Sequence, residues 1–95
     1  MKVDKTALEF DWDKGNIGKN KKHNIEDKEA EETFLDKNKV VFKDILHSET
    51  EERFILIGRT NKKRLLYMIF TKRKNKIRII SSRDINKKEV KLYTT

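Results

Sequence analysis

Three apolar runs in the second half of the chain limit its possible folds more than any other feature. The runs are Arg53–Arg59, Arg64–Thr71 and Lys76–Ser82, and they are joined by Thr60–Lys63 and Lys72–Asn75. Connections of this length suit antiparallel hairpins. Apolar residues stand at both odd and even positions of the runs, so much of the sheet is expected to be covered on both faces. The sequence therefore predicts an antiparallel meander.

The segment that precedes this meander predicts a strand and a helix. Leu8, Phe10 and Trp12 alternate with acidic residues, which is the pattern of a half-buried strand. A helix is expected from Lys14 to about Lys22. It would end at Asn24, because asparagine tolerates the left-handed conformation that often terminates a helix.

Two more helices and a short strand complete the predicted fold. A helix is expected from about Asp27 to Leu35, and Val40–Asp44 predicts a short strand. Asn86 opens a last helix, about Lys87 to Tyr93, and Glu89 is its partner in a capping box. Residues 1–95 are therefore expected to form a single α+β domain, with the helices grouped against one side of the sheet. Its order is an N-terminal strand and two helices, a three- to four-stranded antiparallel sheet, and a C-terminal helix.

The composition predicts a thin core and a chain that stays in the cytoplasm. Hydrophobic residues make up 35% of the sequence and charged residues 42%, so little apolar surface can be buried. The chain has no cysteine, and no apolar stretch approaches the roughly 18–20 residues that cross a bilayer. We expect no contact with a membrane. Because the sequence has no glycine-rich phosphate loop and no carboxylate metal cluster, we also expect no metal ion and no other cofactor.

Charge is divided unequally along the chain. Before Arg53, ten lysines stand against fourteen acidic residues, a net charge of −4; from Arg53 onward the net charge is +12, and all six arginines are found there. A guanidinium group can hold two phosphate oxygens at once and stays protonated while it does so. The second half is therefore expected to bind a polyanion, with nucleic acid as the first candidate. The acidic first half indicates an internal or a protein partner.

Most of the arginines lie at strand ends or in the turns beside them. A rigid sheet edged with arginine and lysine can bind a sugar–phosphate backbone by charge. Basic strand ends can equally serve only to keep sheet edges from aggregating. Tyr67 and Tyr93 offer rings for base stacking, although the mid-strand position of Tyr67 favours core packing. The residues expected to contact nucleic acid are Lys22, Arg59, Arg64, Lys72, Arg73 and Arg78.

His23 and His47 are candidates for proton transfer. Cleavage of RNA by its own 2′-hydroxyl needs a base, an acid and a cation over the phosphate, and histidine, glutamate and arginine supply these without a metal. A histidine at the end of a helix can equally be a partner of the helix dipole. Glu51 and Glu52 can equally form a local ion pair with Arg53.

Read as a whole, these residues resemble the BrnT-type toxins, which are the ribonucleases of bacterial toxin–antitoxin pairs. The opening Phe10-Asp11-Trp12-Asp13 with Lys14-Gly15-Asn16 is similar to the FxWDxGN start of that family. The likeness covers roughly Phe10 to Tyr93 and runs through Lys22-His23, Glu29-Ala30-Glu31-Glu32, His47-Ser48, Glu51-Glu52-Arg53, Ile57-Gly58, Arg64-Leu65-Leu66, Thr71-Lys72-Arg73, Ile77–Arg83 and Leu92-Tyr93.

The resemblance implies a RelE-like fold, RNA cleavage by the free toxin, and inhibition by a cognate BrnA-type antitoxin. Such an antitoxin is a small DNA-binding protein, usually encoded just downstream, and the complex binds operator DNA through it. Carried over by position, the implied site residues are His23, Arg53, Arg64 and Arg83. This chain departs from the family pattern at three positions, where Asn24 replaces Gly, Ser82 replaces Ala and Thr94 replaces an acidic residue.

Three functional hypotheses follow. In the first, the chain is a metal-independent endoribonuclease toxin that inhibits translation: Arg53 and Arg83 hold the scissile phosphate, and His23 exchanges protons. In the second, it is a non-catalytic nucleic-acid-binding module that uses the same basic sheet. In the third, it is a degenerate toxin that only binds the antitoxin.

Overall fold

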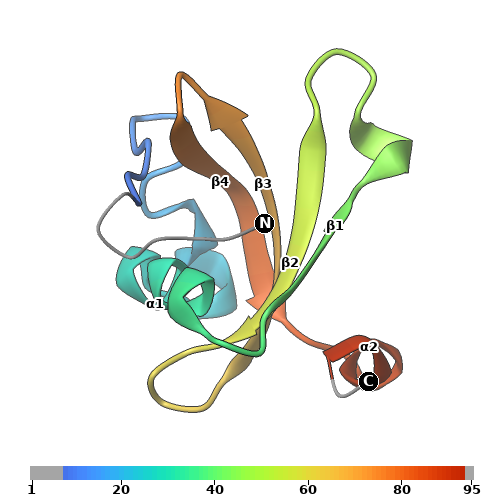
Figure 1. Ribbon diagram of the computed structural model, residues 1–95. Helices are drawn as coiled ribbons and strands as arrows, with labels where there is room; N and C mark the ends of the chain where they lie inside the picture. The colour runs from blue at the N-terminus through green and yellow to red at the C-terminus, as the bar shows by residue number, and fades with distance from the viewer. Residues whose placement is uncertain (1–7, 94–95) are drawn as a thin grey trace.

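The computed structural model describes residues 8–93, except for the side chain of His47. It is an α+β domain with one antiparallel sheet of four strands in the order β1-β2-β3-β4 (Figure 1). The strands are β1 Val40–Lys43, β2 Arg53–Arg59, β3 Leu65–Arg73 and β4 Lys76–Asp84. The α-helices are α1 Asp27–Glu32 and α2 Lys87–Tyr93, and the 3-10 helices are η2 Lys19–His23, η3 Thr33–Leu35 and η4 Ile45–His47. The predicted fold class and the predicted meander are confirmed.

The β3–β4 hairpin is tighter than the sequence predicts. Its turn is Lys74–Asn75 alone, with φ angles of 51° and 68°, the left-handed pair of a two-residue turn that matches the twist of the strands. Lys72 and Arg73 therefore belong to β3 rather than to the turn. An irregularity at Ile69/Phe70 interrupts the register between the two strands.

One face of the sheet, called here the first face, carries the core. Leu56, Leu66 and Met68 are fully buried on it, and α1 with η3 covers them (Figure 1). Phe34 meets Phe70 edge to face at 5.0 Å between ring centroids, a geometry worth about 0.5–1.5 kcal/mol beyond the area buried. The helix from about Asp27 to Leu35 is thus confirmed, with η3 as its tightened last turn.

The helix α2 does not pack against the first face with α1, so the prediction that all helices group on one side is wrong; its Tyr93 hydroxyl only reaches Asp36 at the end of η3, at 2.7 Å. The helix lies apart from α1, near the end of β4 (Figure 1). Glu89 of α2 receives hydrogen bonds from Arg83, which belongs to the opposite, second face by strand alternation. The predicted cap is confirmed: Glu89 N–H donates to the Asn86 side chain at 2.9 Å, and Asn86 N–H donates to Glu89 at 3.0 Å.

The N-terminal segment lies along the free edge of β4. The half-buried Phe10 forms a single parallel bridge with Ile77, where Asp11 N–H donates to the Ile77 carbonyl at 2.8 Å. Leu8, Phe10 and Trp12 pack against the core cluster, so the alternation is confirmed. The segment makes one bridge rather than the predicted strand.

The helix predicted from Lys14 to Lys22 is wrong; turns and the short η2 take its place. Gly18 is left-handed, with φ 66°, and interrupts any helix there. The side chains of Asn16 and Asn20, both 3% exposed, bind the backbone of β4 instead: Asn16 donates to the Ile79 carbonyl at 3.2 Å, and Ser82 N–H donates to Asn20 at 2.9 Å. Asparagine favours such backbone contacts over helix interiors.

Asn24 takes the left-handed conformation that the sequence predicts, with φ 59°.

In the part of the chain that the structure describes, no helix is long and apolar enough to cross a membrane.

Candidate active site

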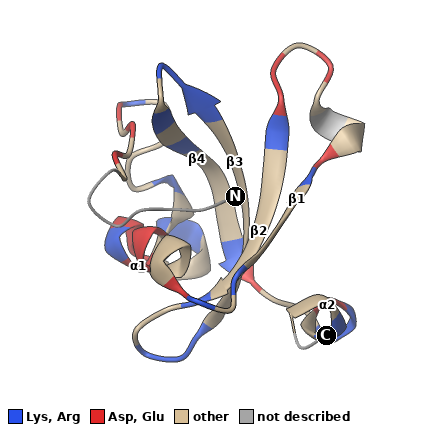
Figure 2. Cartoon of the chain, in the orientation of Figure 1, with Lys and Arg blue, Asp and Glu red and all other residues tan. Residues whose placement is uncertain are grey.

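A basic hollow lies where β2 begins and the β3–β4 hairpin turns. It has a volume of about 170 Å³, and basic residues colour this end of the sheet in Figure 2. We call it the arginine hollow. Its lining residues are Gly15, Asn16, Lys19, Glu51, Arg53, Arg73, Arg78, Ile79 and Ile80.

Strand register explains why arginines from distant parts of the sequence meet here. Arg53 of β2 and Arg78 of β4 are both directly opposite Thr71 of β3, so they stand in one row across the sheet. Adjacent strands lie about 4.8 Å apart, which places the two arginine backbones roughly 10 Å from each other. The buried Thr71 side chain between them donates to the Glu52 carbonyl at 2.7 Å.

Two of the arginines in the hollow are held by carboxylates. Arg73 binds Glu51 with an Nε–Oε2 distance of 2.8 Å, and Arg78 binds both oxygens of Asp13 at 2.9 Å. The hydrogen bond from Arg73 is the main cause that lowers the pKa of Glu51, and the charge of Arg53 acts in the same direction. Glu51 is therefore an ionised carboxylate at neutral pH.

Arg53 differs from its neighbours in the hollow. Among residues 8–93, no ion pair involves its guanidinium. Its backbone is fixed on both sides: Arg53 N–H donates to Ser48 Oγ at 3.0 Å, and Asp44 N–H donates to the Arg53 carbonyl at 2.8 Å. The hollow thus brings together an arginine whose backbone is fixed and whose guanidinium has no ion pair among the described residues, and the ionised carboxylate of Glu51.

Arg64, predicted to contact nucleic acid, makes several hydrogen bonds within the fold. Its guanidinium donates to both oxygens of Asp84 at 2.6 and 2.9 Å, to the Asn24 carbonyl at 2.7 Å and to the His23 carbonyl at 3.1 Å. The hydrogen bond with Asp84 raises the pKa of Arg64. All three guanidinium nitrogens are therefore used to join β3, β4 and the end of η2.

Arg83 and Arg59 lie at the other end of the second face, beside α2. Arg83 donates to Glu89 at 2.8 and 2.6 Å, and its guanidinium carbon lies 4.0 Å from the centroid of the Tyr67 ring. Arg59 lies over Tyr93 at 5.5 Å. An arginine guanidinium therefore lies over each of these two tyrosine rings.

The structure does not bring the three predicted catalytic residues, Arg53, Arg83 and His23, to one place. Arg83 is opposite Tyr67, four residues along β3 from the partner of Arg53, which is about 13 Å along the strand. The exposed His23 lies at the end of η2, beside Arg64 and Asp84, and strand alternation puts Asp84 on the face opposite to Arg83. The pairing register of the strands separates these residues, and their spacing along the sequence does not reveal that register.

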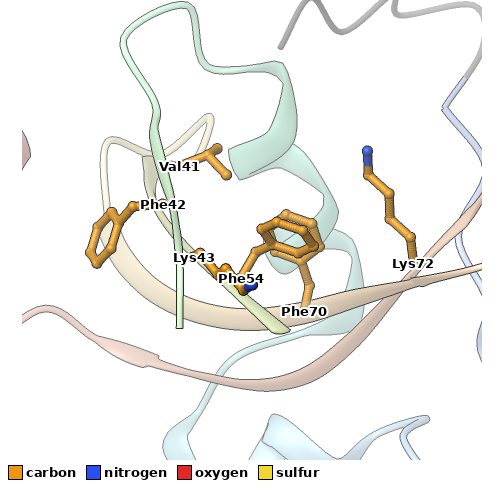
Figure 3. A pocket seen from close by; sticks show the side chains of 6 residues that line it. All are labelled: Val41, Phe42, Lys43, Phe54, Phe70 and Lys72. Carbon is orange, nitrogen blue, oxygen red and sulfur yellow. The ribbon is translucent and has the colours of Figure 1, made fainter. Parts of the chain in front are cut away.

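The two predicted lysines lie outside the hollow. Lys22 is exposed at the end of η2. Lys72 faces the first face, where it lines a mainly apolar groove of about 220 Å³ beside the stacked rings of Phe54 and Phe70 (Figure 3). Lys19 lines the arginine hollow and was missed by the sequence reasoning, because it lies in a segment expected to be helical. The sequence left Glu51 open either as a group for proton transfer or as an ion-pair partner of Arg53, and in the structure its ion pair is with Arg73 instead.

The remaining predictions about the site concern His47 and metals. The prediction for His47 falls on a side chain outside those that the structure describes. Within residues 8–93, no three acidic or histidine side chains are grouped so that they could hold a metal ion.

Comparison with known protein families gives a match. The model of a family described as the ribonuclease toxin BrnT of type II toxin–antitoxin systems matches residues 12–89, which include every residue that lines the arginine hollow. No curated protein sequence matches the chain significantly.

Proposed function

Because this chain belongs to the BrnT family of ribonuclease toxins of type II toxin–antitoxin systems, we propose that it is a metal-independent endoribonuclease acting in the cytoplasm. Its cleavage of RNA inhibits translation. A cognate BrnA-type antitoxin neutralises it in a hetero-oligomer, and operator DNA is bound only through that antitoxin.

The observation that carries this proposal is the placement of Arg53 beside Glu51 in the arginine hollow. A guanidinium without a carboxylate partner binds two phosphate oxygens with little competition from the protein itself. Arg78, kept in position by Asp13, adds positive charge at the same spot. Preorganised cations of this kind stabilise the charge that develops on a phosphate in the transition state.

Glu51 is the proposed general base. Its carboxylate takes the proton of the 2′-hydroxyl, and the 2′-oxygen attacks the neighbouring phosphorus atom. The bond from phosphorus to the 5′-oxygen breaks, and that oxygen takes a proton from solvent. The products are a 2′,3′-cyclic phosphate and a 5′-hydroxyl end. Arg73 positions Glu51 through their 2.8 Å hydrogen bond.

The assignment based on sequence, in which His23 and Arg83 act with Arg53, is the competing proposal for the same reaction. It requires residues at opposite ends of the sheet to meet on one phosphate. The two assignments agree on Arg53 and differ on the group that moves the proton, so substitutions separate them.

The test is cleavage of a labelled RNA by the isolated chain in the presence of EDTA. We expect Glu51→Gln and Arg53→Ala each to lower the rate by about 100-fold or more. His23→Ala and Arg83→Lys should cleave within a fewfold of the unsubstituted chain. Circular dichroism checks that each variant is folded.

Other outcomes are equally informative. Loss of cleavage in His23→Ala or Arg83→Lys, with full activity in Glu51→Gln, would mean that the active site is the one predicted from the sequence and not the arginine hollow. Salt-dependent RNA binding without strand scission at any protein concentration would make the chain a binding module rather than an enzyme.

A further inference from the structure

Two adjacent aliphatic side chains project from η4, beside the arginine hollow. Ile45 is 79% exposed and Leu46 is 84% exposed, the highest values among the large hydrophobic residues that the structure describes. Leu46 lines a second cavity, of about 290 Å³, together with Glu49, Thr50 and Arg53. Arg53 lines both cavities, so the apolar tip and the arginine hollow form one continuous surface.

The base of this loop is anchored by hydrogen bonds, so the backbone that carries the two side chains has a defined position. Asp44, which is 6% exposed, donates its N–H to the Arg53 carbonyl at 2.8 Å. Ser48 Oγ donates to the Asp44 carbonyl at 2.6 Å and accepts the Arg53 N–H at 3.0 Å. The segment between these anchors is the short helix that carries Ile45 and Leu46. The hydrogen bonds that fix the Arg53 backbone therefore also fix the base of the apolar tip.

We propose that Ile45 and Leu46, together with the arginine hollow, form the docking surface for the protein antitoxin. The antitoxin segment that fits has apolar side chains to cover the tip and a carboxylate that enters the hollow and takes the place of the RNA phosphate. Neutralisation is then direct competition with substrate, which rests on the proposed function of the hollow.

The chemistry of the tip favours a protein over RNA as its occupant. Aliphatic side chains have neither a ring on which bases stack nor a charge that attracts phosphate, and Glu49 in the adjoining cavity repels phosphate. A protein partner buries both side chains, and a pair of exposed aliphatic residues rimmed by charge is the pattern of a protein-binding site. The basic hollow next to them adds complementarity for an acidic residue.

The experiment uses the full chain and its cognate antitoxin. The antitoxin affinities of Ile45→Ser/Leu46→Ser and of the unsubstituted chain are compared by calorimetry. Leu92→Ser on α2 is the matched control, since it removes an aliphatic side chain that is 45% exposed near the other end of the second face. RNA cleavage by each variant is measured in parallel.

We expect the double variant to cleave RNA at the normal rate but to bind the antitoxin about tenfold or more weakly. Leu92→Ser should bind normally. Arg53→Ala should also weaken antitoxin binding, and a short, uncleavable 2′-deoxy oligonucleotide should compete with the antitoxin.

An antitoxin affinity of the double variant within about twofold of normal would overturn the inference. So would a loss of RNA cleavage in that variant, or a change in self-association instead of antitoxin affinity. Because antitoxin binding is measured without reference to cleavage, a chain that cleaves no RNA refutes the proposed function but leaves this docking surface open to the same test.

Discussion

Replacing Gly15 by alanine tests whether the position of Arg78 matters for catalysis. A Cβ atom at Gly15 would lie 2.8 Å from Arg78 Nη2 and 3.1 Å from Asp13 Oδ1, whereas ordinary van der Waals contact begins at 3.4 Å. The guanidinium must therefore retreat by about 0.6 Å. Because it is the far end of a flexible side chain, it can do so without disturbing the backbone.

The expected loss follows from that displacement. A misplacement of about 1 Å at a reacting phosphate can cost about 100-fold in rate, so a shift of roughly 0.6 Å should cost about tenfold. Stability should be unchanged or slightly higher, because alanine restricts the unfolded chain. The measurements are kcat/KM on a labelled RNA in EDTA and the midpoint of thermal unfolding.

Gly18→Ala is the matched control, three residues away. Within residues 8–93, and apart from Gly18 itself and its two neighbours, no atom lies within 4 Å of a Cβ placed there, but the φ angle of 66° strains any residue with a side chain, at a cost of about 1–2 kcal/mol. This variant should be less stable yet cleave normally per folded molecule. Normal cleavage by Gly15→Ala, or a loss of stability as large as that of Gly18→Ala, would refute the role given to Arg78.

Three further predictions concern stability. In Gly58→Ala, the new Cβ would lie 2.8 Å from the Thr33 carbonyl oxygen, so η3 must move off the sheet; urea unfolding should show a loss of about 1–3 kcal/mol, and an unchanged midpoint would contradict this packing. Arg64→Lys keeps the positive charge but loses the planar guanidinium that donates several hydrogen bonds, so the free energy of unfolding should fall by about 1–3 kcal/mol while cleavage per folded molecule stays normal. Normal stability with poor cleavage would instead make Arg64 an RNA contact. Hydrogen bonds from arginine lower the pKa of Asp84 and of Glu89 below their ordinary values of 3.8 and 4.5. The stability that these carboxylates contribute is thus complete above their ordinary pKa values and is lost as pH falls through their lowered pKa values. Thermal unfolding followed by circular dichroism from pH 7 to 2 should show a midpoint that falls only below about pH 4.5. A midpoint that stays constant to pH 2 would refute this contribution of Asp84 and Glu89 to stability.

Local sequence patterns predicted most of the sheet and the last helix. The bounds of β2 and α2 are those expected, because alternation and the Asn86 cap are local signals. The segment from Lys14 to Lys22 failed because its structure depends on tertiary contacts. Asn16 and Asn20 turn their side chains to β4, more than sixty residues away in sequence, and no local propensity encodes such contacts.

The sequence could predict the kind of site but not which residues form it. Arginines at strand ends indicated a phosphate-binding surface, and three of them do form the hollow. Which arginines remain available depends on partners that the sequence places far away. Asp13 and Arg78 are 65 residues apart, and the separation of Arg53 from Arg83 follows from register, so their spacing along the chain carries no signal.

Pairing between the two halves of the chain accounts for much of its uneven charge. Glu51 and Asp13 of the acidic half bind Arg73 and Arg78 of the basic half. The second half has only two acidic residues, and each also binds an arginine. The large positive charge of that half therefore overstates its capacity to bind RNA. Of the six arginines, all within the described residues, only Arg53 has neither an ion pair nor a ring contact, and it lines the arginine hollow together with the carboxylate of Glu51.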